Sequence, residues 1–187
     1  MSVFITSNVR LDQAGLNSRK SEPTRQVWLN GYNDVLELRV FSSQPDIPVQ
    51  LTDISALRAY YDAAAKTQNG EVLDLEVRQI AGVQAIVLTM RSVAKPTGFT
   101  YVSSLALPFK EGSFVLKIQA LETITRDDLT TATDALFPAH GLTRVRAEIN
   151  RLASSLKLEP ALNKQAKFQQ KPRGIFGRLR IGKFPFF

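Results

Sequence analysis

Apolar and polar residues alternate most clearly along residues 35–41, a pattern that predicts a strand with one buried face. In this stretch Glu37 and Arg39 fall on one side and the aliphatic residues between them fall on the other. Residues 26–30 are also strand-like, and the turn residues around Gly31 separate the two stretches. We therefore expect the two stretches to form a β-hairpin.

Further strands are expected in the middle of the chain, at 71–79, 83–93, 99–107 and 113–122. The turns between them are short and contain glycine, which favours consecutive antiparallel hairpins because parallel strands need a longer crossover. Before the first hairpin we expect one short strand at Val3–Thr6, followed by a loop.

Helical periodicity predicts a first main helix that begins after Asp53 and runs to about Lys66. Asp53 is a good N-cap because its carboxylate can accept a hydrogen bond from the first turn. At the other end Asn69-Gly70 predicts the stop, because glycine tolerates the left-handed conformation. The stripe expected to be buried consists of Ile54, Leu57, Tyr61 and Ala64 or Ala65.

A second main helix is predicted over 142–157, and Pro160 is expected to end it. A shorter helical piece is expected at about 126–136. The apolar stripe of the second main helix is formed by Leu142, Val145, Ile149, Leu152 and Leu156.

This order of elements predicts an α+β fold: one antiparallel meander sheet whose inner face packs under the two main helices. We expect residues 1–159 to form a single domain and residues 160–187 to form a tail. The length of 187 residues accommodates one such domain.

The aromatic-rich stretch Gly98–Ile118, with the sequence GFTYVSSLALPFKEGSFVLKI, lies in the middle of this pattern. Together with the element order over 26–157, it resembles PsbP-like and DcrB-like proteins, a scaffold also used by the effector-associated chaperones of type VI secretion. The resemblance implies a non-enzymatic binding protein, as an analogy of fold. It assigns no functional residue, and it does not account for the C-terminal tail.

Charge divides the chain into two parts. Seven of the 24 Lys and Arg residues lie in 160–187, which holds no Asp or Glu, so the remaining 17 cations balance the 17 acids of residues 1–159. The net charge of +7 is therefore a property of the tail. The chain has no cysteine, which excludes disulfides, zinc–thiolate sites, iron–sulfur clusters and cysteine nucleophiles.

Candidate catalytic groups are few. His140 is the only histidine, and we interpret it as a loop or capping residue before the second main helix. Asp127, Asp128 and Asp134 form the densest acidic cluster, but adjacent residues on a helix do not face each other and acids are common in first turns. We therefore predict no catalytic residue, no metal site and no cofactor, and we expect that the protein is not an enzyme.

Gly177–Lys183 has the spacing of the first part of a phosphate-binding loop. The motif requires Ser or Thr next, between a strand and a helix, whereas Phe184 and then Pro185 follow. This interpretation is rejected.

Aromatic residues in the periodic segments, among them Trp28, Tyr60 and Tyr61, are expected in the core or in a pocket wall. Tyr101 alternates with Phe99 on one strand face, and that face would be a binding surface if it were exposed.

The tail interleaves its cations with five of the eleven phenylalanines. Three interpretations remain open: docking on a protein partner, attraction to an anionic surface, and nucleic-acid binding with cations on phosphates and Phe rings stacked on bases. Arg178–Ile181 alternates cation and aliphatic residue, which suits a strand added to a partner's sheet edge. The residues predicted to bind a partner are Lys171, Arg173, Phe176, Arg178, Arg180, Lys183, Phe184, Phe186 and Phe187.

The sequence thus predicts a non-enzymatic interaction protein, such as an adaptor, a chaperone or a subunit of a larger assembly. The alternative is a nucleic-acid-associated protein whose basic tail binds phosphate. The N-terminus lacks the pattern of a signal peptide and no apolar run has transmembrane length, so we expect a cytoplasmic protein without a membrane span.

Overall fold

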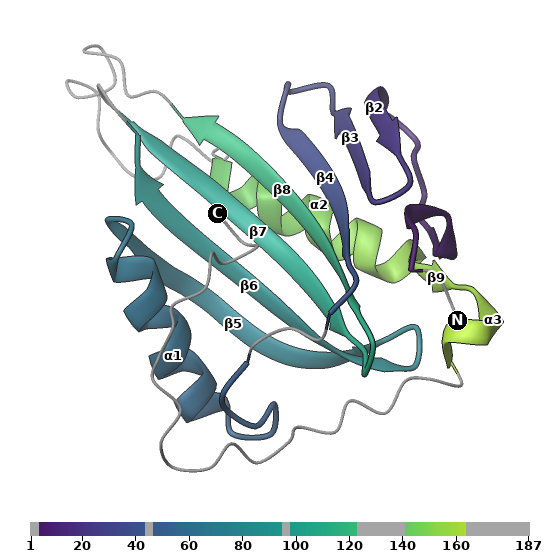
Figure 1. Ribbon diagram of the computed structural model, residues 1–187. Coiled ribbons are helices and arrows are strands. Elements are labelled where there is room, and N and C mark those ends of the chain that lie inside the picture. The colour runs from purple at the N-terminus through teal and green to yellow at the C-terminus, as the bar shows by residue number, and fades with distance from the viewer. Residues whose placement is uncertain (1–3, 44–46, 95–97, 123–140, 164–187) are drawn as a thin grey trace.

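The computed structural model describes residues 4–43, 47–94, 98–122 and 141–163. Within these ranges one antiparallel sheet has the strand order β2-β3-β4-β8-β7-β6-β5 (Figure 1). The strands are β2 (Asn17–Glu22), β3 (Arg25–Leu29), β4 (Val35–Phe41), β5 (Gly70–Ile80), β6 (Val83–Val93), β7 (Phe99–Pro108) and β8 (Ser113–Glu122).

The sheet consists of two meanders joined in its middle. β2, β3 and β4 pair with their neighbours in chain order, as do β5, β6, β7 and β8, and the pairing of β4 with β8 unites the two sets. The crossover from β4 to β5 contains helix α1 (Ile54–Lys66) and places β5 at the far edge. The predicted strands of the hairpin and the four-stranded meander are therefore confirmed.

The beginning of the chain differs from the prediction. Instead of a strand at Val3–Thr6, the described residues form a 3-10 turn, η1 (Thr6–Asn8). The Asn8 side chain accepts a hydrogen bond from the Ile5 backbone N–H at 2.8 Å, a local bond that competes with strand formation. A two-residue strand, β1 (Val9–Arg10), follows and pairs with β9 (Lys157–Leu158).

The expected loop before the hairpin also proves wrong, because β2 lies within it. All six residues of β2 are exposed and polar, so no hydrophobic alternation marks the strand. It forms because the free edge of β3 offers backbone hydrogen-bonding groups over Arg25–Leu29.

Helix α1 begins as predicted, since the Asp53 carboxylate accepts a hydrogen bond from Ala56 N at 2.9 Å. Ile54 is an exception to the expected buried stripe, because it lies exposed in the first turn. At the other end the left-handed residue is Asn69, with φ +54°, and not Gly70. Gly70 begins β5, where an added Cβ would lie 3.0 Å from the Arg91 carbonyl oxygen.

Helix α2 (Gly141–Ser155) has the expected stripe, with Val145, Ile149 and Leu152 buried. It ends before the predicted residue 157, because Lys157 and its neighbour turn away to pair with β1. Pro160 does not end α2 but begins the short helix α3 (Pro160–Asn163), a position where its fixed φ suits the first helical turn.

The two main helices lie on opposite faces of the sheet, and not on one face as predicted (Figure 1). α2 packs on β7 and β8, where Leu105, Leu116 and Ile118 are fully buried. α1 packs on β5, and its cluster includes Ile86 and Leu88 of β6. β6 carries buried apolar side chains on both of its faces, which is typical of a strand that is covered on both sides.

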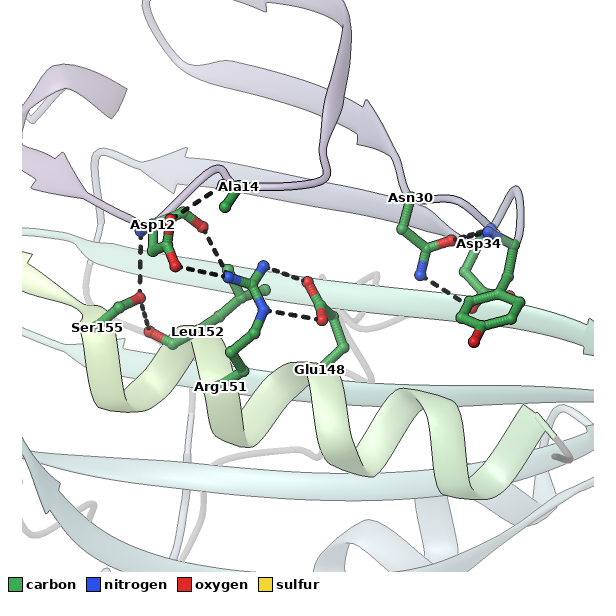
Figure 2. A network of polar contacts seen from close by, with 9 residues as sticks. Asp12, Ala14, Asn30, Asp34, Glu148, Arg151, Leu152 and Ser155 are labelled. Carbon is green, nitrogen blue, oxygen red and sulfur yellow. Dashed lines mark hydrogen bonds and ion pairs between the residues drawn. The ribbon is translucent and has the colours of Figure 1, made fainter. Parts of the chain in front are cut away.

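Polar contacts attach α2 to the first part of the chain, as Figure 2 shows. Arg151 forms ion pairs with Asp12 at 3.0 Å and with Glu148 at 2.6 Å. The Ser155 hydroxyl accepts a hydrogen bond from the Asp12 backbone N–H at 3.2 Å. Further along the helix, Arg144 makes two hydrogen bonds of 3.0 Å to the buried Asp34 in the β3–β4 turn.

Candidate functional site

The residues that the sequence singled out for partner binding, 171–187 of the tail, lie outside the described residues. So do Asp127, Asp128, Asp134 and His140, as well as the helical piece expected at 126–136. A candidate site is therefore built from the body of the protein.

On the side of the sheet that carries α1, no described helix packs on β3, β4 or β8. Among the described helices, α1 packs on β5 at the far edge, whereas α2 lies on the opposite face (Figure 1). Strand register places the outward residues of β3, β4 and β8 together on this side. We call this surface the open sheet face; it consists of Arg25, Val27, Leu29, Val35, Glu37, Arg39, Lys117, Gln119 and Leu121.

The intervening residues of the same strands point into the core around α2. Trp28, Leu36, Leu38, Leu116 and Ile118 are all buried there. Alternation along three neighbouring strands thus fixes which side chains belong to the open sheet face. Val35 and Leu121 are the exposed large apolar residues of the open sheet face.

Glu37 lies at the centre of the open sheet face and is bound by three cations. Its Oε1 accepts hydrogen bonds from Arg25 Nε at 2.5 Å and from Arg39 Nε at 2.8 Å. Lys117 Nζ lies 3.5 Å from Oε2. These contacts follow from the register, which sets Arg25 opposite Arg39 and Glu37 opposite Lys117.

The electrostatics of this cluster keep Glu37 ionised. Burial raises the pKa of Glu37, but hydrogen bonds from Arg39 and Arg25 and the charge of Lys117 outweigh that effect, so the pKa lies below its ordinary value of 4.5. Only 6% of the Glu37 side chain is exposed, against 39% for Arg25 and 40% for Arg39. One buried carboxylate is thus surrounded by three cations, and the cluster as a whole is positively charged.

The sequence pointed to part of this site. Alternation over 35–41 placed Glu37 and Arg39 on the outward side. It gave no sign of Arg25 or Lys117, because their approach depends on which strands become neighbours in the sheet. The pairing of β4 with β8 brings together residues from distant parts of the chain.

The strand face that carries Phe99 and Tyr101 is not an exposed binding surface. Tyr101 is buried against the start of α2, where a Cβ added to Gly141 would lie 2.7 Å from its ring. Phe99 is half-buried, and the Arg91 guanidinium lies 4.6 Å from its ring centroid. Trp28 and Tyr61 are core residues, as the sequence indicated.

Features of small-molecule or metal sites are weak in the described residues. A depression of about 180 Å³ lies beside Glu71, Arg91 and Phe99, below the roughly 300–1,000 Å³ of typical ligand pockets. Within the same ranges no group of three or more His, Cys, Asp or Glu side chains is arranged to hold a metal ion. No helix among the described elements is long and apolar enough to cross a membrane.

Comparison with known proteins gives a likeness of fold. No protein-family model matches the chain, and no curated protein matches it either. Among solved structures, the Ran-binding protein Mog1p of Saccharomyces cerevisiae matches with a TM-score of 0.51 and 11% identity, over 80% of this chain and 88% of Mog1p. A point mutant of Mog1 matches equally, with a TM-score of 0.51.

The matched structures also include a PsbP-like protein, CyanoP of Synechocystis, with a TM-score of 0.38 and 15% identity over 78% of this chain and 82% of CyanoP. The PsbP-like resemblance expected from the element order is thus represented among the matches. Because the TM-scores to Mog1p and its mutant exceed one half, this chain shares the fold of Mog1p.

Proposed function

We propose that the chain is a non-enzymatic, cytoplasmic interaction protein, an adaptor, chaperone or assembly subunit, that binds a protein partner through the open sheet face and its C-terminal tail. The observation that carries the proposal is the cluster of Arg25, Arg39 and Lys117 around Glu37. These cations are carried by neighbouring strands of one sheet and are held by Glu37, so a partner meets a preorganised surface. Exposed Val35 and Leu121 supply apolar contact area beside the charges.

The fold comparison supports this proposal by analogy. Mog1p, which shares the fold, is a Ran-binding protein. Fold alone does not determine function, because unrelated activities occur on one scaffold. The analogy therefore supports protein binding as a class, and the open sheet face supplies the surface.

The tail enters the proposal as a second docking element. Its cations and phenylalanines, Lys171, Arg173, Phe176, Arg178, Arg180, Lys183, Phe184, Phe186 and Phe187, combine charge attraction with apolar contact. Phenylalanine at this density favours a protein groove over a purely electrostatic contact. Nucleic-acid binding stays the alternative, because the same cations would neutralise phosphates.

Site-specific photo-crosslinking in cells tests the proposal with the full chain. Benzoylphenylalanine at Val35, on the open sheet face, is expected to give a protein adduct. The matched control carries the same group at Thr143, an exposed residue of α2 on the opposite side of the sheet. Equal adduct yields at the two positions would argue against docking on the open sheet face.

The same experiment separates the alternative function. Adducts that disappear on nuclease treatment and not on protease treatment would favour nucleic acid. For the tail, replacement of its seven cations by glutamine in the full chain is expected to lower the yield of the protein adduct at Val35. An unchanged yield would remove the tail from the proposal.

A further inference from the structure

Two arginines stand directly opposite each other on the open sheet face. Arg25 of β3 and Arg39 of β4 are cross-strand partners, and both direct Nε to one oxygen of Glu37. Like charges in this arrangement repel each other. The single carboxylate compensates one of the two, and the nearby ammonium of Lys117 adds a further positive charge.

Both guanidinium groups retain unused donors. Each arginine also carries N–H groups on its Nη atoms, in a planar fork that matches a carboxylate. In the described part of the chain, the hydrogen bonds of Arg25 and Arg39 are made through Nε and none is made through an Nη atom. Their side chains are 39% and 40% exposed, so an anion can reach them from solvent.

The buried Glu37 carboxylate fixes the orientation of Arg25 and Arg39. Because Glu37 is almost fully buried and binds both Nε atoms, it determines the direction of the two guanidinium planes. Such preorganisation reduces the conformational entropy lost on binding. The basic tail of the same chain has no acid and cannot supply the missing negative charge. Among the residues that the structure describes, Glu37 is the only acid paired with Arg25 and Arg39, so an acidic group from another molecule would complement the remaining positive charge.

We propose that Arg25 and Arg39 bind carboxylates of an acidic segment of a partner protein, with Glu37 as the positioning residue. Val27 and Val35, which flank the cluster on β3 and β4, would contact apolar residues on the same side of the segment as the acids. This inference rests on the proposed function and names the chemistry of its partner. Bidentate arginine–carboxylate pairs give such recognition both energy and geometry.

The test is fluorescence anisotropy of the full chain with a labelled peptide about twelve residues long, in which pairs of glutamates alternate with pairs of valines. Each side of this peptide, when extended, then carries both residue types. Arg25→Gln with Arg39→Gln is expected to weaken binding by at least about tenfold. The control is Arg10→Gln with Arg19→Gln, which removes the same charge from two exposed arginines that do not contact Glu37. This control is expected to change the affinity by less than about twofold.

Two further variants keep the proposal falsifiable if the first does not fold. Arg25→Lys with Arg39→Lys retains both charges and the neutralisation of Glu37, but it loses the planar forks, so weaker binding is expected by about threefold or more. Glu37→Gln changes the cluster from one carboxylate and three cations to three cations alone. The amide oxygen of glutamine can still accept hydrogen bonds from the two Nε atoms, so the arginines keep their orientation while the compensating charge is lost. The variant is therefore expected to bind the acidic peptide more tightly, an effect of opposite sign that general unfolding cannot produce.

Equal loss of affinity in the Arg25/Arg39 and Arg10/Arg19 variants would overturn the inference, because binding would then follow net charge. So would a single-stranded oligonucleotide of equal charge that binds more tightly than the peptide and depends on the same two arginines. If the peptide fails to bind while Val35 still gives a protein adduct, this inference fails and the proposed function stands. If the peptide binds but no adduct forms in cells, the proposed function fails instead.

Discussion

Glu37 is a buried carboxylate on a partly exposed sheet face, and three cations stabilise its ionised form. Because its pKa in the folded chain lies below the ordinary value of 4.5, the ionised group stabilises the fold above that pH. This contribution is lost as the pH falls through the folded-state pKa. The free energy of unfolding therefore decreases as the pH falls, as expected for a carboxylate that is bonded to cations in the native state.

Glu37→Gln is expected to lower the free energy of unfolding at pH 7 by about 1–3 kcal/mol, because the hydrogen bonds to an ionised acceptor are lost. The difference from the wild type should shrink as the pH is lowered from about 6 to about 3. Urea unfolding at a series of pH values measures this. Glu111→Gln, in an exposed turn, is the control, and a pH-independent difference for Glu37→Gln would contradict the argument.

At the level of elements, α2 is anchored by ion pairs as well as by its apolar stripe. Arg144 makes two hydrogen bonds to Asp34, whose side chain is only 2% exposed. Asp34 also accepts a hydrogen bond from the Asn30 side chain at 3.1 Å, within the turn that joins β3 to β4. This contact sets the position of the two strands that carry Arg25 and Arg39 relative to the helix.

Arg144→Met is expected to destabilise the protein by about 3 kcal/mol, because it leaves a buried carboxylate without its cation. The comparison is Arg146→Met, which removes an exposed ion pair of the same helix, the contact of 3.6 Å between Arg146 and Asp74. Since that pair is accessible to water, a cost below about 1 kcal/mol is expected. Urea denaturation of both variants provides the comparison, and equal costs would contradict the assigned role of Asp34.

On the scale of the whole molecule, the pairing of β4 with β8 makes one sheet from two meanders. Leu36, Leu38, Leu116 and Ile118 lie along this seam and are buried in the core around α2. A continuous core across the seam favours cooperative unfolding of both meanders.

Trp28 is the only tryptophan and lies buried in β3, so its fluorescence reports on the first meander. We expect its unfolding transition to coincide with that of far-UV circular dichroism, to which β5–β8 contribute most of the strand signal. Ile118→Ala, at a fully buried site of the seam, should lower the free energy of unfolding by about 2–5 kcal/mol and move both transitions together. A separate, earlier fluorescence transition would show that the meanders unfold independently.

The sequence by itself determined most of the local elements. Alternation located β4, strand-like stretches between short glycine-containing turns located β5 to β8, and the Asp53 cap and apolar spacing located α1 and α2. These signals extend over a few residues, and each reflects the chain's own periodicity. The exposed strand β2 was missed because its polar residues carry no such signal. The charge division between body and tail also follows from sequence alone.

Tertiary structure alone decided the face on which each helix packs and the composition of the open sheet face. The sequence placed Glu37 and Arg39 outward, but only the neighbouring strands could supply Arg25 and Lys117. Strand pairing depends on hydrogen bonds and packing between distant segments, for which local periodicity holds no information. For the same physical reason, the apolar residues on both faces of β6 do not say which helix covers which face. The crossover through α1, which places β5 at the edge of the sheet, decided this.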